Sequence, residues 1–162
     1  MKKVSLLLAV FIFIGCNNVA NIPSPIPKLD TSKMKSIFGS NVKKDYFTGG
    51  KLRSKFIMSD KTGQNGLLKK YGYNGKLTST VNIKRGVKNG TETLFDQSGR
   101  LLKKTPYAQG RKQGVLEAFY PNGQIMATIT YVNNVKHGKA AKYNTDGSIN
   151  QQVTFKNGNI AN

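Results

Sequence analysis

The side chains that could carry out chemistry are few in this chain, and most of them are cations. Among 162 residues there is one His, His137, and one Cys, Cys16. His137 lies in a predicted turn, where an imidazole is expected to be solvated. We therefore expect no catalytic Cys–His or Ser–His pair and no transition-metal site.

The carboxylates do not suggest a catalytic site either. Asp96 and Asp146 fall in predicted turns, where Asp is favoured because its side chain bonds the local backbone. A paired-carboxylate glycosidase would need a cleft, which a single-layer repeat does not provide. Pairs such as Gly75-Lys76 lack the strand, loop and helix of a phosphate-binding loop. We predict a non-enzymatic protein with no catalytic residue, metal or cofactor.

The cations are in large excess and partly periodic. The chain has 26 Lys and Arg against 7 Asp and Glu, a formal net charge of +19, which predicts affinity for anionic surfaces. Lys88, Lys112 and Lys136 recur at one interval, with Arg85 and Arg111 beside them. We expect these residues to form a row along one edge of a sheet, suited to several separated phosphates or carboxylates. The same lysines would also serve simply to keep an edge soluble.

Three series of residues share one 24-residue period. The aromatic series is Phe47, Tyr71, Phe95, Phe119 and Tyr143. The two glycine series are Gly66, Gly90, Gly114 and Gly138, and Gly75, Gly99, Gly123 and Gly147, with Gly50 one residue early. Self-similarity at such a period indicates a stacked array of one small unit.

Each unit is expected to consist of two strands and two turns. Asn74-Gly75 is a turn signal, and Leu77, Val81 and Ile83 then alternate with polar residues, as in a half-buried strand. A second turn follows, where Gly86 and its equivalents Gly110 and Asn134 accept left-handed backbone. The sequence predicts an all-β protein, a single twisted antiparallel meander of hairpins. Pro106 falls inside a predicted strand, so we expect a bulge or an edge-facing position there.

The combination of Tyr-x-x-Asn-Gly-Lys-Leu, an alternating strand and Gly-x-Lys-x-Gly resembles the MORN repeat, in its bacterial variant. The best copies are 71–90, 95–114 and 119–138, with partial copies at 47–66 and 143–158. The resemblance implies an array of β-hairpins and contact with membranes.

The first residues are typical of an exported protein. Residues 1–15 have a basic start and a short apolar run, which predicts a signal peptide. Phe13-Ile14-Gly15-Cys16 resembles the lipobox of bacterial lipoproteins, which implies a lipid on Cys16; a plain signal peptide is the alternative. Residues 16–45 are expected to be a lipidated flexible tether with a short helix at 31–39, and residues 46–162 an array of about 4.5 repeats.

These features predict a non-enzymatic lipoprotein of the bacterial cell envelope that presents a basic surface for binding or scaffolding. Asn17, rather than Asp, after the cysteine favours the outer over the inner membrane. The expected partners are an anionic lipid or polymer surface or an acidic envelope protein, and export argues against nucleic acid. An exposed terminal strand would allow edge-to-edge self-association. Two alternatives remain open: an antitoxin or immunity-like protein that inhibits a partner stoichiometrically, and a passive structural module.

Overall fold

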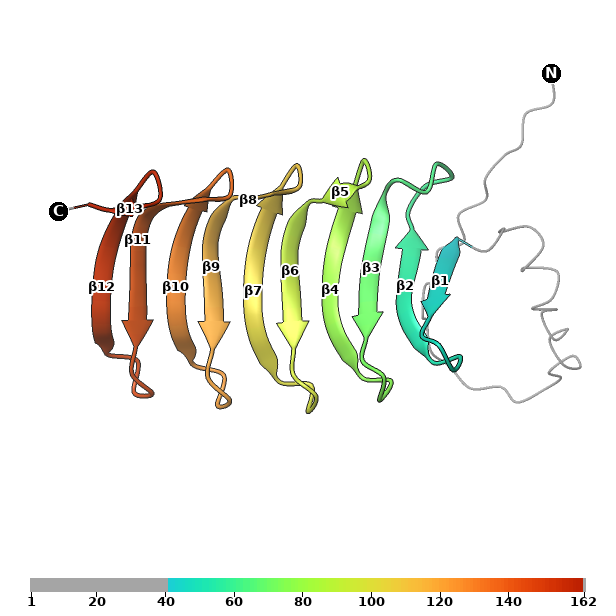
Figure 1. Cartoon of the computed structure of the whole chain (residues 1–162), viewed down its shortest axis with the longest axis horizontal. Coiled ribbons are helices and arrows are strands. Elements are labelled where there is room, and N and C mark those ends of the chain that lie inside the picture. The colour runs from blue at the N-terminus through green and yellow to red at the C-terminus, as the bar shows by residue number, and fades with distance from the viewer. Residues whose placement is uncertain (1–40, 162) are drawn as a thin grey trace, which may run out of the picture.

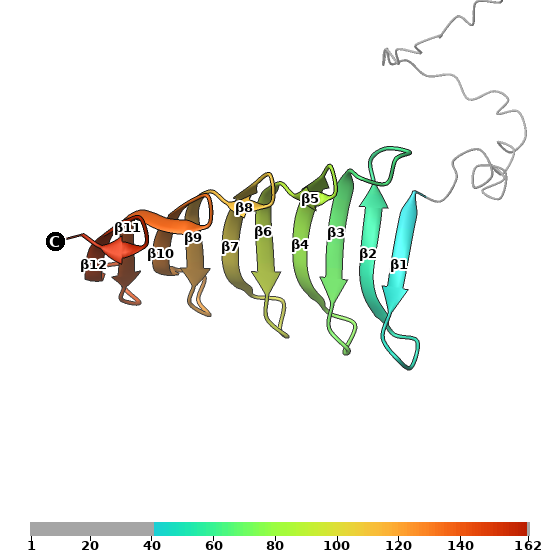
Figure 2. The ribbon, with the colours of Figure 1, turned by 45° about the horizontal axis from the view of Figure 1, so that its top comes forward.

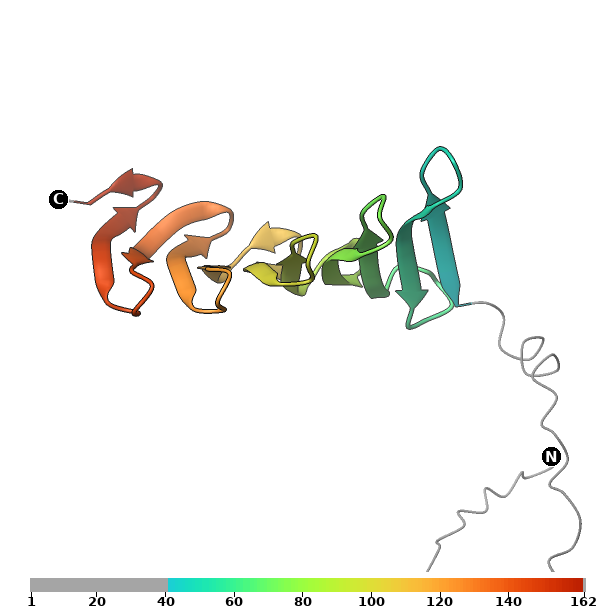
Figure 3. The same cartoon turned by 90° about the horizontal axis from the view of Figure 1, so that it is seen from below.

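The computed structural model describes residues 41–161, and these residues form one antiparallel sheet with no helix. The strands follow one another along the sheet in chain order, as Figure 1 shows. Seen from below, the hairpins curve but form a single layer (Figure 3). The predicted meander is confirmed. Cys16 and the helix expected at 31–39 lie outside the described residues.

The strands are of two kinds, ten of five to nine residues and three of only two residues. They are β1 (Val42–Tyr46), β2 (Leu52–Met58), β3 (Gly66–Tyr71), β4 (Leu77–Lys84), β5 (Val87–Lys88), β6 (Gly90–Phe95), β7 (Leu101–Ala108), β8 (Arg111–Lys112), β9 (Gly114–Phe119), β10 (Ile125–Val132), β11 (Val135–Tyr143), β12 (Ile149–Lys156) and β13 (Asn159–Ile160). The first strand pairs with β2 from Val42 onwards, so the sheet begins before residue 46, where the sequence placed the end of the tether. Its three consecutive charged residues, Lys43-Lys44-Asp45, show no strand-like alternation and hid this strand in a lysine-rich segment.

The strands β4, β7, β10 and β12 each end in a tight two-residue turn. Lys84 pairs with Val87, and the two residues between them have positive φ: 53° at Arg85 and 77° at Gly86. Two consecutive left-handed residues make a type I′ turn, whose twist matches that of the flanking strands. The predicted left-handed backbone at Gly86, Gly110 and Asn134 is confirmed. The preceding position is also left-handed, which the sequence analysis did not predict.

A bulge follows each tight turn. Ile83 of β4 pairs with Lys88, and Thr80, three residues earlier, pairs with Thr93, five residues later, so the returning chain holds two extra residues. Figure 2 shows the short strands β5 and β8 that this bulge separates from β6 and β9. The bulge contains Gly90 and its equivalents. These glycines lie opposite a large side chain of the next strand; the pairs are Gly66 with Ile83, Gly90 with Tyr107, Gly114 with Tyr131 and Gly138 with Phe155.

Pro106 lies opposite such a bulge. It belongs to β7, whose pairing with β9 is interrupted between Lys104 and Tyr107. Its carbonyl accepts a hydrogen bond from the Gln113 N–H at 3.0 Å, and its missing N–H therefore faces the irregular side of the strand. A β-carbon on Gly114 would come within 3.2 Å of the Pro106 ring. The bulge expected at Pro106 is confirmed.

The first repeat is one residue longer than the others, and this corrects the aromatic series. The Phe47 N–H donates to the Lys51 carbonyl at 2.8 Å, as the Gly72 N–H does to the Lys76 carbonyl. Phe47 is thus equivalent to Gly72, and the aromatic equivalent to Tyr71 is Tyr46, which pairs with Leu52. Gly50 then occupies the regular turn position. The extra residue lies in the loop 59–65, which replaces a two-residue turn.

Most of the buried side chains share one face of the sheet, which we call the core face. Its buried residues are Ser79, Val81, Thr105, Leu116 and Ala140. Register places Phe56, Leu68 and Val81 in one cross-strand line, and Leu116, Ile129, Ala140 and Val153 in another. Because directly opposite side chains are close, these lines are packed by neighbouring strands rather than by a second layer.

The last long strand has an open outer edge within the described residues. β12 pairs with β13 only at Phe155 and Lys156, so no strand between residues 41 and 161 covers its outer edge from residue 149 to 153. Ile149 and Ile160 beside it are 58% and 61% exposed. The open edge expected near the C-terminus is present, and self-association through it stays a prediction.

The contact at the first glycine of the bulge series can be tested by adding one methyl group. A β-carbon on Gly66 would clash with the Ile57 backbone carbonyl, whereas one on Gly123 meets nothing within 4 Å. We expect Gly66→Ala to lower the free energy of unfolding by at least about 2 kcal/mol more than Gly123→Ala, whose cost is the ~1–2 kcal/mol of left-handed backbone. Urea denaturation of both variants measures this, and equal losses would contradict the clash.

Candidate anion-binding surface

The predicted lysine row exists, but its backbone joins successive hairpins. Lys88, Lys112 and Lys136 occupy one position, three residues after the tight turn's first residue. Their carbonyls accept hydrogen bonds from N–H groups of the next hairpin's turn: Gly110 at 2.8 Å, Asn134 at 3.0 Å and Gly158 at 2.9 Å. These bonds tie each turn to the one before it, so the row has a structural role.

The ammonium groups of this row lie over aromatic rings. The Nζ atoms of Lys88, Lys112 and Lys136 are 4.7, 5.0 and 5.0 Å from the ring centroids of Tyr107, Tyr131 and Phe155. Such contacts contribute roughly 0.5–1 kcal/mol each at exposed sites. The first hairpin differs, because Gln64 stands in place of the lysine and Ile83 in place of the ring. The Gln64 carbonyl still accepts a hydrogen bond from the Gly86 N–H. The lysines therefore lie against the sheet rather than projecting from its edge.

Lys88 is also neutralised by a carboxylate. Its Nζ lies 2.7 Å from Glu92 Oε1, and the two side chains are 35% and 13% exposed. Partial burial lowers the pKa of the Lys88 ammonium, but the hydrogen bond and charge of Glu92 outweigh burial and raise it above its usual value. Of the three lysines, Lys88 is thus the least available to an external anion.

The two arginines of the predicted site occupy different positions. Arg85 is the first residue of a tight turn, and its N–H donates to Asn65 Oδ1 at 2.8 Å. Arg111 is the first residue of β8 and follows the turn glycine. Both side chains are exposed, and neither takes part in an ion pair between residues 41 and 161. They remain candidates for contact with an anion.

A second set of lysines, missed in the sequence, forms a line across the first strands on the face opposite the core face. Lys44 pairs with Lys55, and Lys55 pairs with Lys69. The line continues through Thr80, Thr93 and Lys104, each directly opposite its neighbour. We call these six residues the lysine track. Neighbouring strands are ~4.8 Å apart, so the track is roughly 24 Å long.

The first three lysines of the track have no counter-charge among residues 41–161. The ion pairs in this part of the chain are Arg53–Asp45, Lys88–Glu92 and Arg100–Asp96. Like charges directly opposite one another destabilise a sheet. Lys104, at the far end, pairs in register with Glu117 and lies 5.5 Å from the centroid of the Phe119 ring. The uncompensated charge is therefore concentrated on β1, β2 and β3.

The carboxylates of Asp60, Asp96 and Asp146 accept hydrogen bonds within their own turns. Bonds from the Asn65 side chain, and then from Thr62, lower the pKa of Asp60. The Arg100 N–H and guanidinium lower that of Asp96, and Ser148 lowers that of Asp146. These acids fix loops at the ends of the sheet, where they do not balance the lysine track.

The sequence could not reveal the track because its register passes through the irregular loop 59–65. The six residues of the track have no constant spacing: Lys55 and Lys69 are 14 residues apart and Lys44 and Lys55 are 11 apart. Only the observed pairing shows that they face one another. The sequence aligned Phe47, rather than Tyr46, with Tyr71. That alignment would shift β1 by one residue relative to the later repeats and place each of its side chains on the opposite face.

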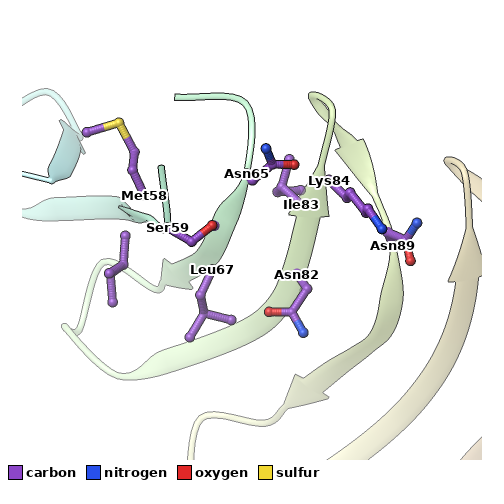
Figure 4. A pocket seen from close by; sticks show the side chains of 10 residues that line it. Met58, Ser59, Asn65, Leu67, Asn82, Ile83, Lys84 and Asn89 are labelled. Atoms are coloured by element: carbon purple, nitrogen blue, oxygen red, sulfur yellow. The ribbon is translucent and has the colours of Figure 1, made fainter. Parts of the chain in front are cut away.

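A hollow of about 660 Å³ lies beside this loop. Figure 4 shows Met58, Leu67 and Ile83 lining it together with the amides of Asn65, Asn82 and Asn89. Asn65 is held by Asp60 and by the Arg85 N–H, so its amide belongs to the loop framework.

Within residues 41–161, no three His, Cys, Asp or Glu side chains gather to hold a metal ion. The same residues contain no helix able to cross a membrane.

Comparison with known proteins identifies the repeat. Residues 112–133 and 136–157 match the family model of the MORN repeat variant. Two consecutive units of the array, covering residues 112–157, are thus similar to this repeat. No curated protein matches the sequence.

Two solved structures are similar at low identity. One is a mutant of S. aureus TarM in complex with Fondaparinux, alpha-GlcNAc-glycerol and UDP, at 12% identity and a TM-score of 0.42. The likeness covers 66% of this chain and 23% of TarM, so it spans less than a quarter of that protein. The other, a protein with unknown function from Bacteroides fragilis, is 15% identical over 75% of this chain and 97% of its own, with a TM-score of 0.19.

The Lys88–Glu92 pair predicts a specific dependence on pH. Because the folded pKa of Lys88 is raised, the stability from the pair is present below the usual value of 10.5 and is lost as pH rises through the folded value. We expect Glu92→Gln to cost about 1 kcal/mol at pH 7 and to remove this alkaline loss. Denaturation at neutral and alkaline pH measures both effects.

The matched control for this pair is Glu117→Gln, which removes a carboxylate that forms no ion pair within residues 41–161. If the two variants had the same stability at both pH values, the Lys88–Glu92 contact would contribute nothing.

Proposed function

We propose that this protein is a non-enzymatic binding scaffold of the bacterial cell envelope, carried on a lipid at Cys16. Its basic sheet would meet an anionic partner: an anionic membrane, a wall polymer or an acidic protein. The similarity of residues 112–157 to the MORN repeat supports the scaffolding role, since this repeat is a non-catalytic module. The anchor rests on the lipobox-like residues that end at Cys16.

The observation that carries the binding role is uncompensated positive charge on an open sheet. The chain has 26 Lys and Arg against 7 Asp and Glu, and residues 41–161 contain three ion pairs. No second layer of residues 41–161 covers either face (Figure 3). Positive charge on an accessible surface accelerates encounter with anions and favours their binding.

The binding role predicts selectivity for anionic probes and sensitivity to salt. The purified full chain is mixed with phosphatidylglycerol vesicles, phosphatidylcholine vesicles, polyglutamate or poly(glycerol phosphate). We expect binding to at least one anionic probe, none to phosphatidylcholine, and about a tenfold loss between 0.1 and 1 M salt as the screening length falls from ~10 to ~3 Å. Equal binding to neutral and anionic vesicles, or no anionic binding, would contradict the proposal.

The anchor has its own test, independent of the anion. The full chain and its Cys16→Ser variant are expressed in bacteria that are fed a clickable palmitate analogue. We expect the label and membrane association in the wild type, and loss of the label with release from the membrane fraction in the variant. Equal labelling of the two proteins would show that Cys16 is not the modified residue.

A further inference from the structure

The lysine track has the form of a binding site for a chain rather than for a surface. Lys44, Lys55 and Lys69 are directly opposite one another on three adjacent strands, so their charges follow a line across the sheet. The line continues through the hydroxyls of Thr80 and Thr93, for which no hydrogen bond is found among residues 41–161, to Lys104. Cations and hydroxyls are the groups that phosphate oxygens accept from.

The two lines beside the track differ at this end of the sheet. On one side are Tyr46, Tyr71 and Arg53, whose charge is paired with Asp45. On the other side no residue is charged. Val42, Ile57 and Leu67 form the next cross-strand line on the same face, two residues along each strand, and that line continues to Asn82. A ligand that follows the lysines would therefore rest its uncharged groups on aliphatic side chains. The single line of charge fits one polymer strand better than a two-dimensional array of headgroups.

The far half of the same line argues against a flat contact. Beyond Lys104 it passes through Glu117, Thr128, Ala141 and Gln152. Along this line, an anionic surface beyond Lys104 would meet one carboxylate and neutral side chains and no further cation. A polymer bound across β1 to β7 would end before Glu117.

The spacing of the track selects among polymers. Adjacent strands place one group every ~4.8 Å, and long lysine side chains can bring their ammonium groups to phosphates several ångströms apart. A polymer that carries one phosphate per small unit matches this spacing. Single-stranded nucleic acid has similar phosphates, but the export expected from residues 1–15 argues against it as the natural ligand.

From this geometry we propose that the lysine track binds a base-free polyol phosphate chain, lying across β1, β2, β3, β4, β6 and β7. The proposal rests on the proposed anion-binding function and names its ligand class and its place. Lys44, Lys55 and Lys69 contact successive phosphates, and the hydroxyls of Thr80 and Thr93 bond the phosphates or polyol hydroxyls that follow. Lys88, Lys112 and Lys136, which lie against rings, contribute only long-range attraction.

The test compares two variants with the same loss of charge. One carries Lys44→Gln, Lys55→Gln and Lys69→Gln; the control carries Lys76→Gln, Lys139→Gln and Lys156→Gln, three exposed lysines outside the track. Binding of fluorescent poly(glycerol phosphate) to the full chain is measured over a range of salt. We expect the track variant to lose at least about tenfold in affinity and about 2 in the slope of log K against log salt, and the control to lose less than about twofold.

Several results would overturn the proposal. If the two variants lose affinity equally, binding depends on net charge and not on the track, while the proposed function stands. If single-stranded DNA binds as tightly as poly(glycerol phosphate) and loses as much in the track variant, the ligand is a nucleic acid. If phosphatidylglycerol vesicles alone bind, the partner is a membrane. If no anionic probe binds, the proposed function fails as well.

Folding of the track variant is a separate readout. Because removal of like charges that face one another relieves repulsion, we expect its melting temperature to equal or exceed that of the wild type. If the track variant melts at or above the wild-type temperature and still fails to bind, the loss of binding is due to the missing lysines and not to unfolding. A lower melting temperature would show that the three lysines support the fold, which contradicts the view that they are free for a ligand.

Discussion

The fold depends on the hydrogen bond that joins each tight turn to the hairpin before it. In a one-layer sheet nothing outside the sheet holds the strands at a fixed pitch. The N–H groups of Gly86, Gly110, Asn134 and Gly158 reach the carbonyls of the preceding hairpin at 2.8–3.0 Å. They can do so because the turn has two left-handed residues and directs these N–H groups outward. The period of the chain is thus the period of one repeated backbone contact.

The recurring large side chains and glycines follow from that contact. After the tight turn, the returning strand takes up a bulge, and its glycine lies opposite Tyr107, Tyr131 or Phe155. The residue that carries the ring is the cross-strand partner of the glycine, and the ammonium group of the preceding hairpin lies over the ring. One unit therefore holds a turn, a bulge, a ring and a cation in mutual contact. Where Ile83 replaces the ring, the uncharged Gln64 replaces the lysine.

This arrangement separates two kinds of positive charge. In the regular repeats, the ammonium groups of Lys88, Lys112 and Lys136 contact aromatic rings, and that of Lys88 also pairs with Glu92. Their regular spacing therefore reflects the packing of the array. Cations in the irregular first repeat lie opposite one another without a counter-charge. Such repulsion lowers the stability of the sheet, and binding of the proposed anionic ligand would relieve it.

The sequence by itself determined the repeated parts of the protein. Glycine and asparagine at the turns, and alternation in residues such as Leu77, Val81 and Ile83, depend on local backbone preferences, so they predict the meander, the tight turns and the bulge at Pro106. Local chemistry also identified the excess of cations. The sequence did not reveal which residues face one another across neighbouring strands, because this depends on register. The loop 59–65 adds one residue, makes Tyr46 rather than Phe47 the first aromatic, and brings Lys44, Lys55 and Lys69 into line. Only the tertiary structure could decide this, since a shift of one residue along a strand sends each side chain to the opposite face.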